Sequence, residues 1–262
     1  MSLVQPNQKA TPIQKFIPSI SGFVLLLTLY GIGQLTELPG ILGQITSPRL
    51  WQMLLTSLGE TLWMVGVSVV LAVVGGLPLG VLLVITSPGN ITENRQLYKV
   101  LSSVTNIGRS IPFIILLVAI IPFTRLLVGT SIGTAAAIVP LTIAAIPFVG
   151  RIVESALRDV DRGVVEAAQS MGASPWQIVV KVLLPEALPT LVLGVTITAV
   201  NLIGYSAMAG AIGGGGLGDL AIRYGYQRFR GDVMLMTVVV LVLLVEIVQA
   251  LGDWAAESLN KK

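Results

Sequence analysis

The chain has 262 residues, of which 54% are hydrophobic and only 11% are charged, and its formal net charge is +3. Soluble domains carry about 25% charged residues, so this composition excludes an ordinary water-soluble globule. The sequence contains no Cys and no His, which excludes disulfides, thiolate nucleophiles, imidazole bases and most transition-metal sites. We therefore expect no catalytic residues and no metal in this chain, and the small positive charge requires no nucleic-acid partner.

Several runs of roughly 18 or more residues are almost free of charge, and each is long enough as a helix to cross a hydrocarbon core of about 30 Å. The runs are continuously apolar and do not alternate, which favours helices over a membrane barrel. The chain is therefore predicted to be an all-α polytopic membrane protein. Six spans are expected, at about Pro18–Leu35, Thr61–Ile85, Val104–Val128, Ile132–Val149, Leu188–Ile212 and Val233–Leu251.

Two of these spans carry further signals. The third contains Pro112 and Pro122, which we expect to break it. The first follows Lys9 and Lys15 and so resembles a signal peptide as well as an anchor. Because no clear small-residue cleavage site follows it, a retained anchor is the preferred interpretation.

Lys and Arg residues in the connecting segments predict the orientation of the spans, because cytoplasmic loops are enriched in them. With an inside N-terminus, ten of them fall inside and five outside, and Arg109 lies near a helix end. The inside set is Lys9, Lys15, Arg95, Lys99, Arg151, Arg158, Arg162, Lys181, Lys261 and Lys262, and the outside set is Arg49, Arg125, Arg223, Arg228 and Arg230. This places both termini and the segment 151–189 in the cytoplasm.

The predicted cytoplasmic segment contains the polar stretch EAAQSMGASPWQIVVKVLLPEALP. A short helix is expected at about Val164–Met171, closed by Gly172 in the left-handed conformation. A second helix is expected to begin with Ser174 as N-cap, Pro175 at its first position and Gln177 completing a capping box.

After this second helix, Pro185 and Pro189 are expected to mark the return to the membrane. From composition alone, the whole segment could be an ordinary amphipathic loop lying at the lipid headgroups.

A spaced motif in this segment favours a functional role. Glu166-Ala167-Ala168, three residues, Gly172, nine residues and Val182-x-Leu184-Pro185 resemble the EAA signature of ABC importer permeases, with Val182 where Ile is usual. The resemblance implies that the segment is a coupling helix that docks into a groove of a separate ATP-hydrolysing subunit. The residues it assigns to docking and to the shape of the turn are Glu166, Ala167, Ala168, Gly172, Ala173, Ser174 and Pro175.

Three longer segments, Arg109–Gly133, Ala136–Leu157 and Gly204–Gly218, resemble the methionine-uptake permeases of the same superfamily. The resemblance covers about Trp51 to the C-terminus and implies the transmembrane domain of a type I ABC importer with five core spans. Residues 1–50 would then be a cytoplasmic tail, an extra span and an outside linker. Residues 51–262 would be the permease domain with its coupling loop 151–189.

The same resemblance implies the partners. Two identical permease subunits would pair with two ABC ATPases in a bacterial cytoplasmic (inner) membrane and receive D- or L-methionine from an extracytoplasmic binding lipoprotein. ATP and Mg would be bound by the ATPase, with no cofactor in this chain. The sequence agrees on one point, since no G-x-x-x-x-G-K-[ST] motif for binding ATP occurs in it.

The fifth predicted span contains the candidate pathway residues. Asn201, Tyr205 and Ser206 are polar groups in an apolar run, and polar residues inside membranes usually face the protein interior. Met208 could contribute, with Tyr205, to an apolar gate. Helix packing is an equally good explanation for any one of them.

Three other features need an interpretation. The run Gly213–Gly218 satisfies G-x-G-x-x-G, but it follows a membrane helix and not a strand, so we expect a flexible outside turn that meets the binding protein. Glu60 and Arg109 are expected to pair with or snorkel toward helix ends. Glu246, inside the last span, is expected to be a structural residue, paired or near the inner interface. It is also the one support for the alternative function, an ion- or proton-coupled transporter acting without an ATPase.

Overall fold

The computed structural model describes residues 47–260, and no β-strand occurs among them. Internal contacts divide the chain into two units, Met1–Ser47 and Pro48–Lys262. The predicted first span, with its tail and linker, lies outside the described residues. The arrangement below is that of the second unit.

Four helices of this unit are long and apolar enough to cross a membrane. They are α3 (Pro48–Thr86), α7 (Thr134–Arg158), α10 (Leu184–Gly210) with the turns that lead into it from Pro175, and α12 (Gly231–Leu259). The predicted second, fourth, fifth and sixth spans are confirmed, each in a longer helix. The 39 residues of α3 extend about 58 Å at ~1.5 Å each, so its ends project beyond a hydrocarbon core of about 30 Å.

The predicted third span is broken near Pro112 and Pro122, as expected, and it begins earlier than Val104. It consists of α4 (Arg95–Ser110), α5 (Phe113–Ala119) and α6 (Ile121–Val128), and the chain bends by 99° between α4 and α5. Ile111, which precedes Pro112, is extended with φ −83° and ψ 121°. This follows because a proline ring disfavours helical geometry in the residue before it.

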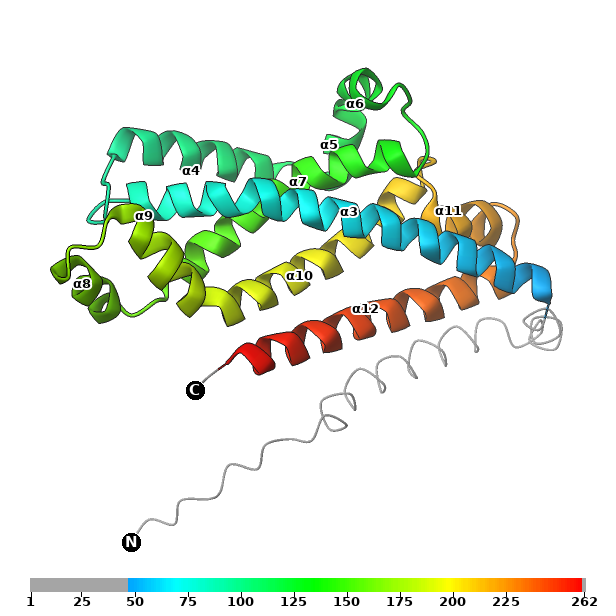
Figure 1. The fold of residues 1–262 in the computed structure, drawn as a ribbon. Helices are drawn as coiled ribbons and strands as arrows, with labels where there is room; N and C mark the ends of the chain where they lie inside the picture. Colours follow the sequence, from blue (N-terminus) through cyan, green and yellow to red (C-terminus); the bar gives the residue numbers. More distant parts are fainter. Residues whose placement is uncertain (1–46, 261–262) are drawn as a thin grey trace, which may run out of the picture. The chain divides into compact units, whose positions relative to one another are not determined.

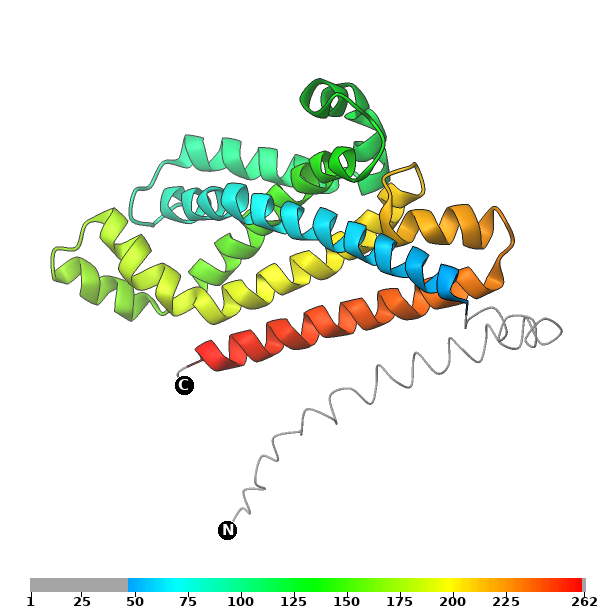
Figure 2. The ribbon, with the colours of Figure 1, turned by 45° about the vertical axis from the view of Figure 1, so that its right-hand side comes forward.

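The four long helices lie lengthwise beside one another in Figures 1 and 2. At one end lie α8 (Arg162–Ser170), α9 (Pro175–Ile178), the turn between α3 and α4, and the end of α12. We call this the hairpin end. At the opposite end, α11 (Gly216–Leu220) and the π-helix η2 (Ala221–Tyr226) lie beside the start of α3.

Glycines let the long helices approach closely. A Cβ added at Gly76 or Gly80 of α3 would lie 2.6 Å from Val149 or 2.4 Å from Val153 of α7. At Gly252 of α12, the added atom would lie 2.0 Å from a threonine of α10. Small residues at helix crossings are typical of membrane proteins, where van der Waals packing drives association.

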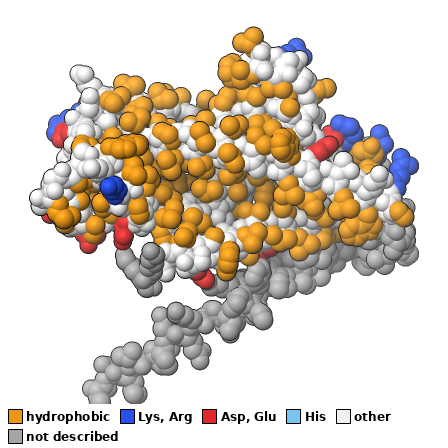
Figure 3. Space-filling model, in the orientation of Figure 1, with side chains coloured by type: hydrophobic (Ala, Val, Ile, Leu, Met, Phe, Trp, Pro, Cys, Tyr) orange, Lys and Arg blue, Asp and Glu red, His pale blue; other side chains and the backbone are white. Residues whose placement is uncertain are grey.

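The surface agrees with a membrane environment. Figure 3 shows hydrophobic side chains along this face of the unit, with most Lys and Arg side chains near its two ends. Large apolar side chains midway along the spans are exposed, among them Val70, Val74 and Ile247. A soluble protein rarely exposes so continuous an apolar surface, and the unit is therefore a multi-span membrane domain.

Candidate functional site

The α8–α9 hairpin, residues 162–178, is built from local signals that the sequence displays. Asp161 caps α8 by accepting a hydrogen bond from the Gly163 amide at 2.7 Å. Gly172 follows the helix at φ +79°, the left-handed conformation expected of it. The predicted capping box is confirmed, because Ser174 Oγ accepts from the Gln177 amide at 3.4 Å and Gln177 Oε1 accepts from the Ser174 amide at 2.8 Å.

The connection from the hairpin to the next span differs from the prediction. The chain stays helical from Pro175 to Gly210 and does not break at Pro185 or Pro189. The π-helix η1 (Val179–Leu183) joins α9 to α10, and the amide of Leu184 donates to the carbonyl of Val179. Pro185 has no N–H to donate and its ring crowds the preceding turn, and the wider turn accommodates it within a continuous helix. The second helix of the hairpin, α9, is therefore continuous with α10, and α8 is joined to it by the turn at Gly172.

The hairpin exposes most of the residues that the motif assigns to docking. Glu166, Ala167, Gly172, Ser174 and Pro175 are exposed. Ala168 differs, because it is only 4% exposed and belongs to the hydrophobic core of this chain, and Ala173 is half-buried against the same core. The small side chain of Ala168 thus lets α8 pack against the permease.

Two large apolar side chains on the hairpin were not identified from the motif. Met171 is 81% exposed and Trp176 is 71% exposed, while the adjacent Ile178 and Val179 are buried. Trp and Met are enriched in protein–protein interfaces. The sequence feature that could have identified Met171 and Trp176 is their position beside the capped turn, before the apolar pair Ile178–Val179.

A buried polar network, also not predicted, joins α7 to α4 at the hairpin end. The Glu154 side chain is only 5% exposed and forms ion pairs with Arg151 and, at 2.7 Å, with Arg158. Arg151 also donates to Ser102 Oγ at 2.6 Å and to Asn106 Oδ1 at 2.8 Å on α4. Because a buried charge needs full compensation, this network fixes the two helices in register.

The turn between α3 and α4 closes the hairpin end. The backbone amide of Gly89 donates to Glu93 at 3.0 Å and Arg95 donates to it at 2.7 Å. These two donors hold the pKa of the Glu93 carboxyl below its usual value. This turn, the end of α7 and α8 together line a cavity of about 700 Å³ that includes Glu166 and Arg158.

Two of the four predicted pathway residues meet at one cavity. Asn201 and Tyr205 of α10 line a space of about 220 Å³ with Arg109 of α4, Phe113 of α5 and Phe148 of α7. The rings of Tyr205 and Phe113 are stacked, with centroids 4.6 Å apart and an interplanar angle of 3°.

The other two predicted pathway residues do not line that cavity. Ser206 is buried and donates to the carbonyl of Ile203 at 2.7 Å. Met208 is 47% exposed elsewhere on α10.

The glycine run after α10 was expected to be a flexible turn, and that expectation is wrong, because the run is closely packed. Glu60 Oε2 of α3 accepts from the Gly216 amide at 2.7 Å and Thr61 Oγ1 accepts from the Leu217 amide at 2.9 Å. A Cβ at Gly218 would lie 2.4 Å from Ala207. Glu60 therefore pairs with a helix end, as predicted.

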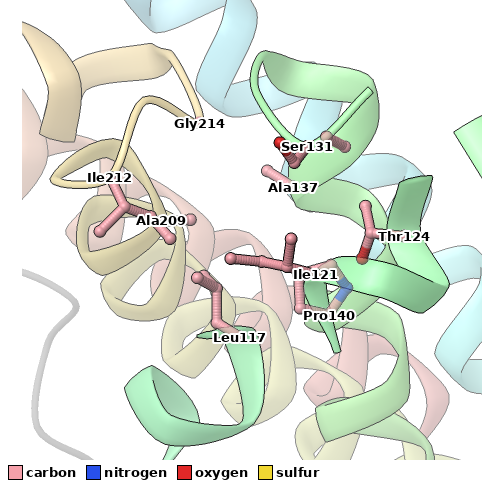
Figure 4. Close-up of a pocket in the computed structure, with 10 residues that line it drawn as sticks. Leu117, Ile121, Thr124, Ser131, Ala137, Pro140, Ala209, Ile212 and Gly214 are labelled. Carbon is pink, nitrogen blue, oxygen red and sulfur yellow. The ribbon is translucent and has the colours of Figure 1, made fainter. Parts of the chain in front are cut away.

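Beside this turn lies a small hollow of about 20 Å³, lined by both apolar and polar side chains (Figure 4). Ala209, Ile212 and Gly214 face Leu117 and Ile121 across it. Its volume is close to that of a single water probe, so it cannot hold an amino acid.

The fold and the hairpin define an ABC importer permease. Residues 76–262 match the family described as binding-protein-dependent transport system inner membrane component, and the chain belongs to this family. A probable D-methionine transport system permease from Vibrio cholerae is 59% identical over 77% of this chain and 89% of its own. A methionine import system permease from Bacillus subtilis is 47% identical over 69% of this chain and 82% of its own.

Comparison with solved structures supports the same family. The permease chain in an inward-facing methionine ABC transporter, MetNI, matches with a TM-score of 0.81 and 52% identity, over 82% of this chain and 100% of that chain. The crystal structure of an amino-acid ABC transporter with histidines matches with a TM-score of 0.67 and 19% identity, and this likeness shows a common fold only.

Proposed function

We propose that this chain is the membrane-spanning permease subunit of an ATP-driven importer that takes up methionine, in the D or the L form. Its similarity to methionine permeases over most of their length supports the substrate. The observation that carries the coupling mechanism is the capped, exposed hairpin that continues without a break into a spanning helix.

The hairpin couples the permease to its energy source. A separate ABC ATPase, one copy for each of two identical permease subunits, binds ATP and Mg and holds the hairpin through Glu166, Met171 and Trp176. When the two ATPases close on ATP, they displace the hairpins. Because α9, η1 and α10 form one continuous helix, that displacement tilts α10 and changes access to Asn201 and Tyr205.

The hairpin end lies in the cytoplasm, together with the C-terminus. Lys and Arg residues support this orientation, because Arg95, Lys99, Arg158, Arg162 and Lys181 lie at or near the hairpin end. An extracytoplasmic binding lipoprotein delivers the substrate at the opposite end.

Family membership supports this importer and not the ion-coupled alternative. That alternative depended on Glu246, which is half-buried in α12 and has no ion-pair or hydrogen-bond partner among residues 47–260. A secondary transporter needs no ATPase, so the two functions differ in what co-purifies with the chain.

The test is co-purification of the tagged permease with the ATPase subunit. The Glu166→Lys, Gly172→Trp double variant places a reversed charge and a bulky ring on the exposed hairpin. Gly129→Trp is the matched control, because Gly129 and Gly172 both have positive φ and open space where a Cβ would stand. We expect the ATPase with the wild type and the control and its loss from the double variant.

Uptake of labelled methionine into cells should follow the same order. Retention of the ATPase and of uptake by the double variant would contradict the coupling role. A stable wild-type permease that captures no ATPase would contradict the importer itself.

A further inference from the structure

The cavity between α4, α7 and α10 contains a charged residue at an unusual depth. Gly108 packs against Pro147 of α7, where an added Cβ would lie 3.1 Å from the proline ring. Pro147 lies midway along α7, so Arg109 lies level with the middle of a spanning helix. Ionisable residues at this depth are rare, face a protein or water-filled interior, and most often belong to a substrate or ion pathway.

The side chain of Arg109 is available to bind a ligand. Arg109 and Asn201 are both exposed toward the cavity that they line, and within the part of the chain that the structure describes neither has a hydrogen-bond or ion-pair partner. Arg151, one turn beyond Pro147 on α7, is by contrast bound to Glu154, Ser102 and Asn106. The guanidinium of Arg109 therefore has five donors available for a ligand.

The remaining walls of the cavity are mostly aromatic and apolar. Phe113 and Tyr205 stack on one another, and Phe148 and Leu202 also line the cavity. Thr198 is the polar exception, and its hydroxyl donates to the carbonyl of Gly194 at 2.8 Å. Ligand pockets are typically ~300–1,000 Å³ for drug-sized molecules, so a cavity of about 220 Å³ suits a smaller ligand, such as one amino acid. A thioether sulfur packs favourably against aromatic rings.

We propose that Arg109 and Asn201 bind the α-carboxylate of the amino acid as it passes through the permease, and that the Phe113–Tyr205 stack contacts its side chain. This inference rests on the proposed import function. The planar guanidinium donates two parallel hydrogen bonds to the carboxylate, and the amide of Asn201 donates a third. The permease thus has its own recognition site for amino acids, distinct from the binding lipoprotein.

A structural role for Arg109 makes a different prediction. Arg109 stands in the last turn of α4, where any positive charge interacts favourably with the helix dipole. Lysine preserves that interaction but has no planar fork. A purely structural Arg109 is therefore replaced by lysine without effect, whereas a carboxylate-binding Arg109 is not.

The experiment uses the assembled permease–ATPase complex in nanodiscs and a photoreactive diazirine analogue of L-methionine. Labelled peptides are mapped by mass spectrometry, and we expect labels within 105–113, 144–148 and 198–205 that methionine competes away. Arg109→Gln should raise the half-saturating probe concentration about tenfold or more, as expected for loss of a charge-assisted hydrogen bond. Arg109→Lys should also raise it.

The matched control is Arg125→Gln, which changes an arginine in the last turn of α6, outside the cavity, and should leave labelling unchanged. A further arm uses only the wild type. The amine that lacks the carboxylate of methionine, 3-(methylthio)propylamine, should compete at least about tenfold more weakly than methionine.

Competition by this amine as strong as by methionine, or wild-type labelling of Arg109→Lys and Arg109→Gln, would overturn the proposal. Labels confined to other segments in a complex that still imports methionine would overturn it and leave the import function intact. A complex that neither imports methionine nor takes up label would instead contradict the import function on which the proposal rests.

Discussion

Trp176 provides the most quantitative test of the coupling hairpin. Its side chain is 71% exposed in this chain. Aromatic side chains bury about 150–250 Å² when fully covered, so docking would remove on the order of 150 Å² of Trp176 from water. At about 25 cal/mol per Å², this corresponds to up to ~4 kcal/mol. Because tryptophans at interface centres cost about 2–4 kcal/mol when truncated, we expect Trp176→Ala to weaken ATPase binding about 30- to 700-fold.

The assay is the dissociation constant between the permease in nanodiscs and its purified ATPase. Trp63→Ala is the control, because Trp63 is 62% exposed on a spanning helix, away from the hairpin. The thermal stability of the permease alone should be unchanged within about 0.5 kcal/mol, since Trp176 is a surface residue. A dissociation constant within about twofold of the wild type would refute the assignment of Trp176 to the interface.

Four further variants test the packing of the spans, the buried ion-pair network and the turn at Glu93. Gly218→Ala should destabilise the permease by about 1–3 kcal/mol or more, because the new Cβ would lie 2.4 Å from backbone atoms. Gly204→Ala, with open space at the same atom in mid-helix, should be neutral or stabilise by up to ~1 kcal/mol, and equal thermal shifts for the two would contradict this account. Glu154→Gln should lower stability by about 3–5 kcal/mol in thermal unfolding, because it leaves two arginines without their buried partner; an unchanged melting temperature would show that the network is dispensable. The pKa of Glu93 is lowered in the folded state by hydrogen bonds from a backbone amide and an arginine, so its stabilisation is present above the ordinary glutamate pKa. That stabilisation should disappear as the pH falls through the lowered pKa of Glu93. The difference in melting temperature between the wild type and Glu93→Gln should therefore narrow at low pH. A difference that stays constant across the pH titration would argue against this role of Glu93.

Local signals were sufficient to predict the hairpin and the long spans. Helix caps and glycine turns depend on a few neighbouring residues, and Ser174, Gln177 and Gly172 adopt the expected conformations. Continuous apolar runs likewise predicted α3, α7, α10 and α12, since length and hydropathy are properties of one segment. The comparisons confirm the importer-permease family that the EAA motif indicated.

Features that depend on packing between segments were not predictable in this way. Pro185 was expected to mark the return to the membrane, but the π-helix η1 accommodates it within a continuous helix. Ala168 was expected at the docking surface, yet its face of α8 meets the core. The depth of Arg109 depends on where α4 crosses α7. The sequence gives only the distance of Arg109 from a helix end, and that distance suggested snorkelling.

The π-turn between the hairpin and α10 also fixes a rotational relationship. An α-helix turns by about 100° per residue, so one residue added or removed between Val179 and Leu183 would rotate the hairpin by about 100° around the α10 axis. The face that presents Trp176 and the face that carries Asn201 are thus held in phase by the length of one five-residue turn. The length of this turn therefore cannot change without misaligning the two faces.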